Sequence, residues 1–263
     1  MYSTEENKLE EILKLAADEP AHRPEFCKVL LNSTVYVITP DNQMGETEDA
    51  IISAGSKIEI EFWQKPDGTQ IIPFFSSLQL LQNSIEQELS YIKLPAKSLF
   101  EITLGTTLFL NPNSDYGKEF VPGEVETLLS VGLSQIPTQR ITEENTEVLL
   151  GQPSEYPSKM IDSLTQLFVK HKNIKHAFLA IMHDTSIDEK PHLLVGIEAD
   201  GDLESVLKEA GVVAADTAPN GESVDLCCVT GSDTISKYMI NETKPFYERK
   251  WGSKIRTSVS GNA

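Results

Sequence analysis

The chain has 263 residues, of which 40% are hydrophobic and 24% are charged, a composition typical of packed globular proteins and unlike that of disordered ones. Its formal net charge is −18. Nucleic-acid binding depends on lysine and arginine side chains that neutralise phosphates, so this charge argues against a nucleic-acid partner. We interpret the acidity as a solvated surface, with a basic protein partner as the alternative.

The cysteines and the apolar runs bear on the cellular compartment. The three cysteines Cys27, Cys227 and Cys228 do not have the spacing of a zinc site. The adjacent pair ends an apolar run, so we expect both to be buried in a strand. The first residues are polar, and no apolar run approaches the roughly 18 residues of a membrane span. We therefore expect a cytoplasmic protein without a membrane-spanning helix.

The first part of the chain predicts two helices and a strand. Apolar residues at Leu9, Ile12, Leu13 and Ala16 share one helical face, which predicts a helix over residues 7–18. A second short helix is expected over 22–31, where Pro24 falls in the first turn. The β-branched run at 33–39 predicts a strand, and residues 40–56 are expected to be a loop.

A β-hairpin is predicted next, and it carries the first candidate binding residues. Two apolar runs flank the turn Pro66-Asp67-Gly68, and the first of them starts at Lys57. We expect Pro73 to end the second run, before Phe74 and Phe75 and a helix start at the two serines that follow. Trp63, Phe74 and Phe75 are candidate residues of a protein interface. The alternative is that these rings belong to the core.

Short helices and strands then alternate at close spacing. The pattern predicts a helix from Leu78 to Ile85, a strand at 91–95, a helix at 96–102, a strand at 107–112 and a helix at 123–130. The connections are too short for a doubly wound parallel sheet. The pattern therefore favours an α+β fold.

The second half of the chain predicts a separate domain. Gly132 and Pro137 make residues 131–140 the best linker candidate, and we divide the chain into domains 1–135 and 136–263. Helices are expected at 158–171, 203–210 and 232–240, and strands at 174–182, 191–199 and 223–229. This order predicts a small sheet with one face covered. Each domain is thus expected to be a small mixed or largely antiparallel sheet with helices packed on it.

No motif predicts catalysis or a cofactor. Four carboxylates at Glu198, Asp200, Asp202 and Glu204 are compatible with a hard-cation site, but the spacing better fits a turn followed by a helix cap. The five histidines are scattered, and the glycines do not form a phosphate-binding loop. Single glycines such as Gly211 are interpreted as turns and helix ends. We therefore predict no metal, no cofactor and no catalytic residue, and a protein that is not an enzyme.

The segment 244–256 is the strongest sequence signal for an interaction. It holds five basic residues and one acid on an otherwise acidic chain. Phe246, Tyr247, Arg249 and Trp251 are the candidate residues, because aromatic side chains and arginine dominate interface hot spots. The alternatives are contact with anionic lipid, a clamp onto the acidic N-terminal half, or a terminal element whose rings complete the core.

Several segments together resemble the enhanced serine sensitivity protein (SseB) family of bacteria. They are Glu19–Phe26, the hairpin with Ile72–Ser76, Gly117–Phe120, Met160–Thr165, Gly196–Asp202 and Pro245–Gly252. The resemblance implies an N-terminal and a C-terminal SseB domain in one cytoplasmic protein. It also implies a phenotype, altered tolerance of serine on overproduction, but no reaction, cofactor or functional residue. A type III secretion component has a similar name; without a long apolar helix, we attribute that link to the name alone.

The expected function is therefore a non-enzymatic binding or adaptor module that influences serine metabolism through an unidentified protein partner. The first alternative is a protein that binds an amino acid or acts weakly on one in serine or sulfur amino-acid metabolism. A pocket with convergent polar groups and a carboxylate or histidine of perturbed pKa would favour this alternative, whereas a flat apolar-aromatic patch would favour the adaptor. The second alternative is a structural homo-oligomer.

Overall fold

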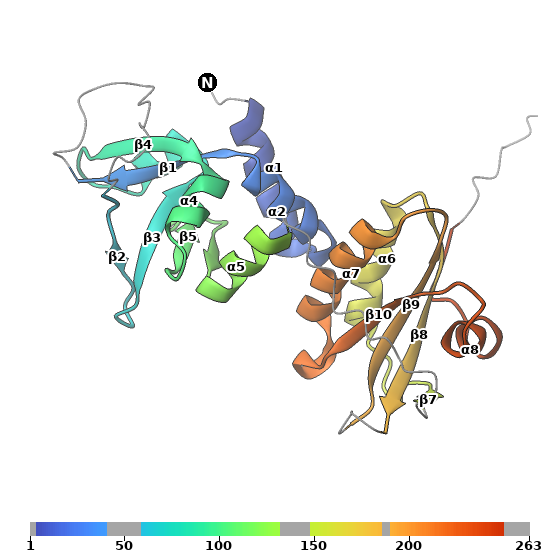
Figure 1. Ribbon diagram of the computed structural model, residues 1–263. Coiled ribbons are helices and arrows are strands. Elements are labelled where there is room, and N and C mark those ends of the chain that lie inside the picture. The colour runs from blue at the N-terminus through green and yellow to red at the C-terminus, as the bar shows by residue number, and fades with distance from the viewer. Residues whose placement is uncertain (1–3, 41–58, 132–147, 186–189, 250–263) are drawn as a thin grey trace, which may run out of the picture. The chain divides into compact units, whose positions relative to one another are not determined.

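The chain forms two compact units, Met1–Gln139 and Arg140–Ala263. The computed structural model describes residues 4–40, 59–131, 148–185 and 190–249 (Figure 1). The predicted loop after Pro40 and the predicted domain boundary fall outside the described residues, as does most of the linker candidate. Both units combine helices with a mixed sheet, which confirms the predicted α+β fold.

The N-terminal unit contains five α-helices and six strands among its described residues. The helices are α1 (Thr4–Asp18), α2 (Arg23–Leu31), α3 (Leu78–Asn83), α4 (Ala96–Ile102) and α5 (Pro122–Val131), with a short 3₁₀ turn at Pro20–His22. The strands are β1 (Thr34–Thr39), β2 (Trp63–Gln64), β3 (Gln70–Phe75), β4 (Ser90–Pro95), β5 (Leu108–Leu110) and β6 (Lys118–Phe120). Their order is β4-β1-β3-β5-β6, with β2 beside β3. Among the described strand pairs of this sheet, β3–β5 is parallel and the others are antiparallel.

Apolar side chains on both faces of this sheet account for its packing. One face carries Val35, Val37, Phe74 and Leu108, which pack with buried residues of α1, α2, α4 and α5. The other face carries Tyr36, Ile38 and Phe75, which pack against Leu81 of α3. Because successive strand residues point to opposite faces, β1 and β3 each supply both cores.

The predicted hairpin is present, but the predicted role of Pro73 is wrong. The Lys65 carbonyl accepts from Gly68 N at 2.9 Å, and Gly68 has φ +87°, a conformation that favours glycine. Pro73 does not end the strand, since β3 continues to Phe75. Strand β2 pairs as far as Ile71 and β1 begins pairing at Phe74. Pro73 lies between these two partners, where its missing N–H interrupts neither ladder.

The C-terminal unit has three helices and five strands among its described residues. The helices are α6 (Ser158–Val169), α7 (Glu204–Thr217) and α8 (Thr234–Glu242), with a 3₁₀ turn at Pro219–Gly221. The strands are β7 (Val148–Gly151), β8 (Ile174–Asp184), β9 (His192–Ala199), β10 (Val224–Cys228) and β11 (Tyr247–Glu248). The sheet order is β10-β9-β8-β11, and β7 also pairs with β8.

Both faces of this sheet are covered, which corrects the prediction of one covered face. In Figure 1, α6 and α7 lie on one side of β8 and β9, and α8 lies on the other. Met239 of α8 packs into a cluster with Phe178, Leu194 and Val229. A Cβ at Gly196 would lie 2.1 Å from Met239 Sδ, so the absent side chain allows α8 to approach the sheet.

Three further expectations differ from the structure. Helix α7 extends to Thr217, whereas the sequence predicts that it ends at residue 210, before Gly211. Gly211 lies inside the helix, where a Cβ would meet Leu226 Cδ1 at 3.4 Å. Strands β6, β7 and β11 were not predicted, since two to four residues carry too little periodicity. Cys228 is exposed, although both adjacent cysteines were expected to be buried.

Candidate functional site

The aromatic residues of the hairpin are part of the N-terminal core. Phe74 and Phe75 are fully buried. Phe74 lies 5.8 Å from Phe100 between ring centroids, and Phe75 lies 6.1 Å from the half-buried Trp63. In this fold the two phenylalanines cannot contact a partner, because strand β3 places them on opposite packed faces. Of the three hairpin candidates, only Trp63 retains partial exposure.

The described part of the C-terminal segment packs against its own domain. The ring of Phe246 stacks on Phe168 with centroids 6.1 Å apart, and the hydroxyl of the buried Tyr247 donates to the Phe168 carbonyl at 3.2 Å. Strand β11 pairs with His176 and Ala177 of β8. These contacts match the alternative in which the rings complete the core. Trp251 lies outside the described residues.

Arg249 holds the end of β11 in place. Its guanidinium donates to the Lys172 carbonyl and lies 3.5 Å from a carboxylate oxygen of Asp200. Lys175 contacts the same carboxylate at 2.6 Å. The Lys175 and Arg249 side chains hold the pKa of Asp200 below its usual range, with Lys175 as the larger cause. The arrangement is a clamp between β11 and the loop after β9.

The acidic loop at residues 198–204 uses its carboxylates locally. Glu198 lies 2.7 Å from a ring nitrogen of His176, and Asp202 accepts from the Glu204 backbone N–H at 2.9 Å. The sequence predicts Asp202 as the helix cap, but α7 begins at Glu204 and its N-cap position is Leu203, which makes no side-chain cap hydrogen bond. The Asp202 contact instead closes a turn just before the helix. Within the described residues, no three His, Cys, Asp or Glu side chains are close enough to hold a metal ion.

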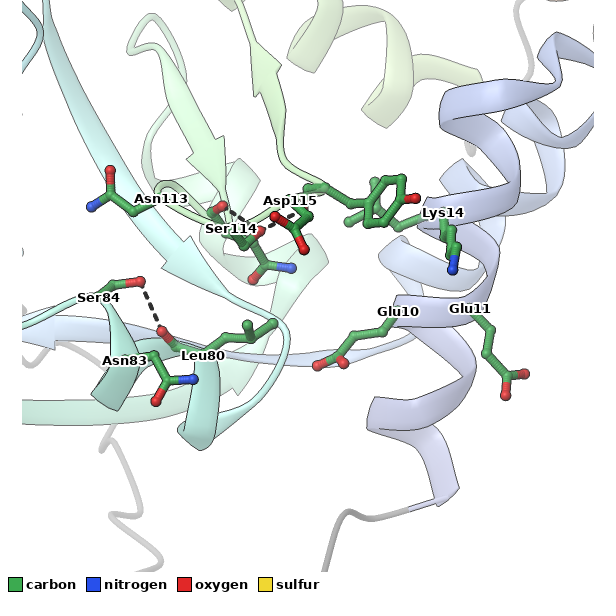
Figure 2. Close-up of a pocket in the computed structure, with 12 residues that line it drawn as sticks. Glu10, Glu11, Lys14, Leu80, Asn83, Ser84, Asn113, Ser114 and Asp115 are labelled. Carbon is green, nitrogen blue, oxygen red and sulfur yellow. Dashed lines mark hydrogen bonds between the residues drawn. The ribbon is translucent and has the colours of Figure 1, made fainter.

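A pocket in the N-terminal unit brings together residues that the sequence did not single out. Its volume is about 480 Å³, within the range of roughly 300–1,000 Å³ that is typical of small-molecule sites. Figure 2 shows it between helix α1, helix α3 and the loop after β5. The lining residues are Glu10, Glu11, Leu13, Lys14, Leu80, Asn83, Ser84, Asn111, Asn113, Ser114, Asp115 and Tyr116.

The loop after β5 has an unusual and well-anchored backbone. Asn111 and Asn113 have φ values of +50° and +65°, in the left-handed region that asparagine tolerates better than most residues. Ser114 Oγ donates to the carbonyls of Asn111 and Tyr116 at 2.9 and 2.7 Å. Gly117 closes the loop, because a Cβ there would lie 3.0 Å from the Asn111 carbonyl. Such backbone conformations concentrate at functional sites when surrounding contacts hold them.

A buried hydrogen-bond network joins this loop to the end of β3 and to helix α1. Asn111 is 2% exposed, and its Oδ1 accepts from the Ser76 backbone N–H at 2.9 Å. Ser76 Oγ donates to Glu10 Oε1 at 3.0 Å. One turn earlier on α1, Glu6 accepts from the Tyr36 hydroxyl at 2.8 Å. Together with burial, this contact raises the pKa of Tyr36. The pocket wall formed by α1 is thus fixed to the sheet.

The serine hydroxyls at and beside the pocket are already engaged in hydrogen bonds. Ser76 contacts a carboxylate but is fully buried, so a substrate cannot reach its hydroxyl. Ser84 donates to the carbonyls of Leu80 and Pro112, which occupies its only proton. No histidine or cysteine is among the described residues that line the pocket. What the pocket offers is carboxylate, carboxamide and hydroxyl groups at an open cavity.

The signal that could have found this pocket is the run Asn111-Pro112-Asn113-Ser114-Asp115. It is rich in turn-forming residues, and two asparagines separated by one residue favour left-handed backbone. The sequence analysis predicted this run only as the end of a strand.

None of the described helices has the length and apolar character needed to cross a membrane.

The comparisons with known proteins agree with both units. The SseB protein N-terminal domain family matches residues 9–127, and the SseB protein C-terminal domain family matches residues 142–249. Protein SseB of Escherichia coli (strain K12) is 42% identical over 255 residues, covering 97% of this chain and 96% of the relative; Protein SseB of Shigella flexneri matches to the same extent. No solved structure matches. The resemblance noted from the sequence is thereby confirmed, and the chain belongs to the SseB family.

Proposed function

We propose that this protein is a non-enzymatic binding protein and that the pocket between α1, α3 and the loop after β5 is its ligand site. The observation that carries the proposal is the pocket itself: three chain segments distant in sequence supply polar groups to one cavity of about 480 Å³. Buried hydrogen bonds hold those groups in place before a ligand arrives, which lowers the entropic cost of binding.

The ligand class that fits best is a small polar molecule. Among the functions considered from the sequence, we favour a protein that binds a small molecule such as an amino acid, because the pocket supplies the convergent polar groups that were one part of its criterion. We propose in addition that the protein is cytoplasmic and influences serine tolerance. Serine therefore belongs in the first set of ligands to be tested.

Ligand stabilisation of the full chain tests this proposal. Thermal unfolding is followed with serine, other amino acids, small amines, polyols and carboxylic acids at millimolar concentration. A ligand at one hundred times its Kd stabilises the folded state by about 2.7 kcal/mol, a readily measured shift. Asn83→Trp, which fills the pocket from α3, should abolish the shift. Gln82→Trp, the neighbouring exposed residue that does not line the pocket, should preserve it.

If no compound stabilises the chain, or if Asn83→Trp and Gln82→Trp leave the same shift, the pocket is not a ligand site. A shift that also survives in Asn83→Trp would place binding elsewhere on the chain.

An adaptor that acts through a protein partner is the second candidate, and a different observation favours it. Ile102, Leu104 and Val121 are each half-exposed or more. Since Leu108 pairs with Phe120, the residues just before β5 and just after β6 lie at the same end of the sheet. This apolar end is a more accessible docking surface than the buried Phe74 and Phe75. A homo-oligomer could use the same surface, and light scattering of the purified chain distinguishes the two.

An affinity pull-down that compares the proteins retained by each variant chain tests the adaptor proposal. Leu104→Asp combined with Val121→Asp should lose a specific partner that the unmodified chain retains. Leu149→Asp is the matched control, an exposed apolar residue of the C-terminal unit. Identical sets of retained proteins for all three chains would contradict docking through this surface.

A further inference from the structure

We propose that the pocket of the N-terminal unit binds a small organic cation, a molecule with at least one primary ammonium group and a net positive charge. This inference rests on the proposed function and narrows its small polar ligand to a cation, so that serine, a zwitterion without net charge, should bind more weakly than a simple amine. It is carried by four features of the pocket: its charge, its shape, the ring of Tyr116 and the spare donor of Asn111.

The charge of the lining favours a cation. Three carboxylates (Glu10, Glu11 and Asp115) stand against one ammonium (Lys14), a net formal charge of −2. In Figure 2, Glu10 and Asp115 face the space between the loop and α3, whereas Glu11 points away from it. An ammonium group placed in this space would meet carboxylates from two separate elements. An anion there would be repelled by both.

The shape of the pocket favours an organic cation over a metal ion. A metal ion needs several oxygen ligands within about 2.6 Å of one point. The carboxylates that line the pocket do not form such a cluster among the described residues. A cavity of about 480 Å³ is instead large enough for an extended amine with its charges a few bonds apart.

The Tyr116 ring shows where an ammonium group would lie. Lys14 Nζ lies 5.5 Å from the centroid of this ring, within the range of a cation–π interaction. Lys14 is exposed, so its long side chain is free to leave the ring when a ligand ammonium takes its place. Lys14 is therefore a competitor for the site, and its removal should strengthen cation binding.

Asn111 supplies a hydrogen bond for a second polar group of the ligand. Its Nδ2 donates to Ser76 Oγ at 3.0 Å, which uses one of two amide hydrogens. Among the described residues, this amide nitrogen makes no second hydrogen bond. Because Asn111 is 2% exposed and lines the pocket, a hydroxyl or carbonyl oxygen of a bound molecule is the available partner.

Titration of the full chain with compounds of graded charge tests the inference. The probes are diaminobutane, ethanolamine, serine, glycerol and succinate, and the readouts are calorimetry and amide NMR spectra. We expect affinity to fall in that order and to weaken with added salt, as it does for charge-driven binding. We also expect the largest amide shifts at Leu80–Ser84 and at Asn111–Tyr116.

Three variants and a control make the test specific. Asp115→Asn and Glu10→Gln each remove one charge and retain hydrogen-bonding capacity, and each should weaken diaminobutane binding by about threefold to fivefold. Lys14→Gln should strengthen it by a similar factor. Glu101→Gln removes an exposed charge from α4, away from the pocket lining, and should leave the affinity unchanged.

The outcomes separate this inference from the proposed function. If glycerol or succinate shifts the pocket amides and the amines do not, the cation is refuted while the pocket remains a ligand site. If no probe shifts these amides, both proposals fail. If Glu101→Gln weakens amine binding as much as Asp115→Asn does, the amines bind the acidic surface at large and the inference is refuted.

Discussion

Asn111 is the residue on which the geometry of the pocket depends most, so its replacement gives the sharpest prediction. Removal of the side chain leaves the buried Ser76 N–H without its acceptor, which costs about 1–3 kcal/mol. Alanine also has to adopt the left-handed backbone at φ +50°, which costs a further 1–2 kcal/mol or so. We expect Asn111→Ala to lower the free energy of unfolding by about 2–5 kcal/mol.

Asn111→Gly separates the two contributions. Glycine adopts the left-handed backbone without strain, so this variant should be about 1 kcal/mol more stable than the alanine variant. Asn113 is the matched control, since it has φ +65° but an exposed side chain. Asn113→Ala should cost only the backbone contribution of about 1–2 kcal/mol.

Trp63 provides the assay. The sequence contains two tryptophans, and Trp251→Phe leaves Trp63 as the reporter of the N-terminal unit, where it contacts Phe75. Urea unfolding followed by its fluorescence yields the free energy of each variant. If Asn111→Ala costs no more than Asn113→Ala, the buried network does not hold the loop and the reasoning about the pocket is wrong.

Three further predictions concern the C-terminal unit. Gly196→Ala should destabilise it by about 1–3 kcal/mol because the new methyl group enters the contact with α8; equal stability would contradict that packing. Arg249→Ala should speed amide exchange at the end of β11, and the lowered pKa of Asp200 adds a pH dependence: its stabilisation is complete above the ordinary carboxyl pKa of about 4 and is lost as pH falls through the lower folded value. If Arg249→Ala left amide exchange at the end of β11 unchanged, both above the ordinary carboxyl pKa and below the folded pKa of Asp200, the clamp would be refuted. Cys228 should react with a thiol reagent before Cys227, because burial raises the pKa of Cys227 to about 12; equal rates in the folded chain would contradict this.

The sequence predicted the elements whose residues repeat a clear pattern. Helix α6 has its apolar residues on one face, and β1 is a β-branched run; both lie within two residues of their predicted bounds. The predicted end of α7 at Gly211 was wrong. A glycine inside a helix differs from a glycine that ends one only in the neighbour against which it packs, here Leu226. The predicted end of β3 at Pro73 was wrong for a similar reason. Whether a strand can contain a proline depends on which residues of the neighbouring strands pair before and after it.

The candidate site was less accessible to sequence reasoning. The aromatic residues drew attention because they are clustered in sequence, yet Phe74 and Phe75 point to opposite faces of one strand and are buried. The pocket, by contrast, joins Glu10, Ser84 and Asp115, which are separated by more than a hundred positions from first to last. Individually these are ordinary surface residues. Only the parallel pairing of β3 with β5 places the loop after β5 beside the end of β3.

The most direct test of the pocket as a ligand site is an amide NMR titration of the full chain with diaminobutane, repeated with Asn83→Trp. We predict shifts concentrated at Leu80–Ser84 and Asn111–Tyr116, which vanish in the variant. Shifts centred on Phe246–Arg249, or a response that is the same in both chains, would contradict the assignment of this pocket as the binding site.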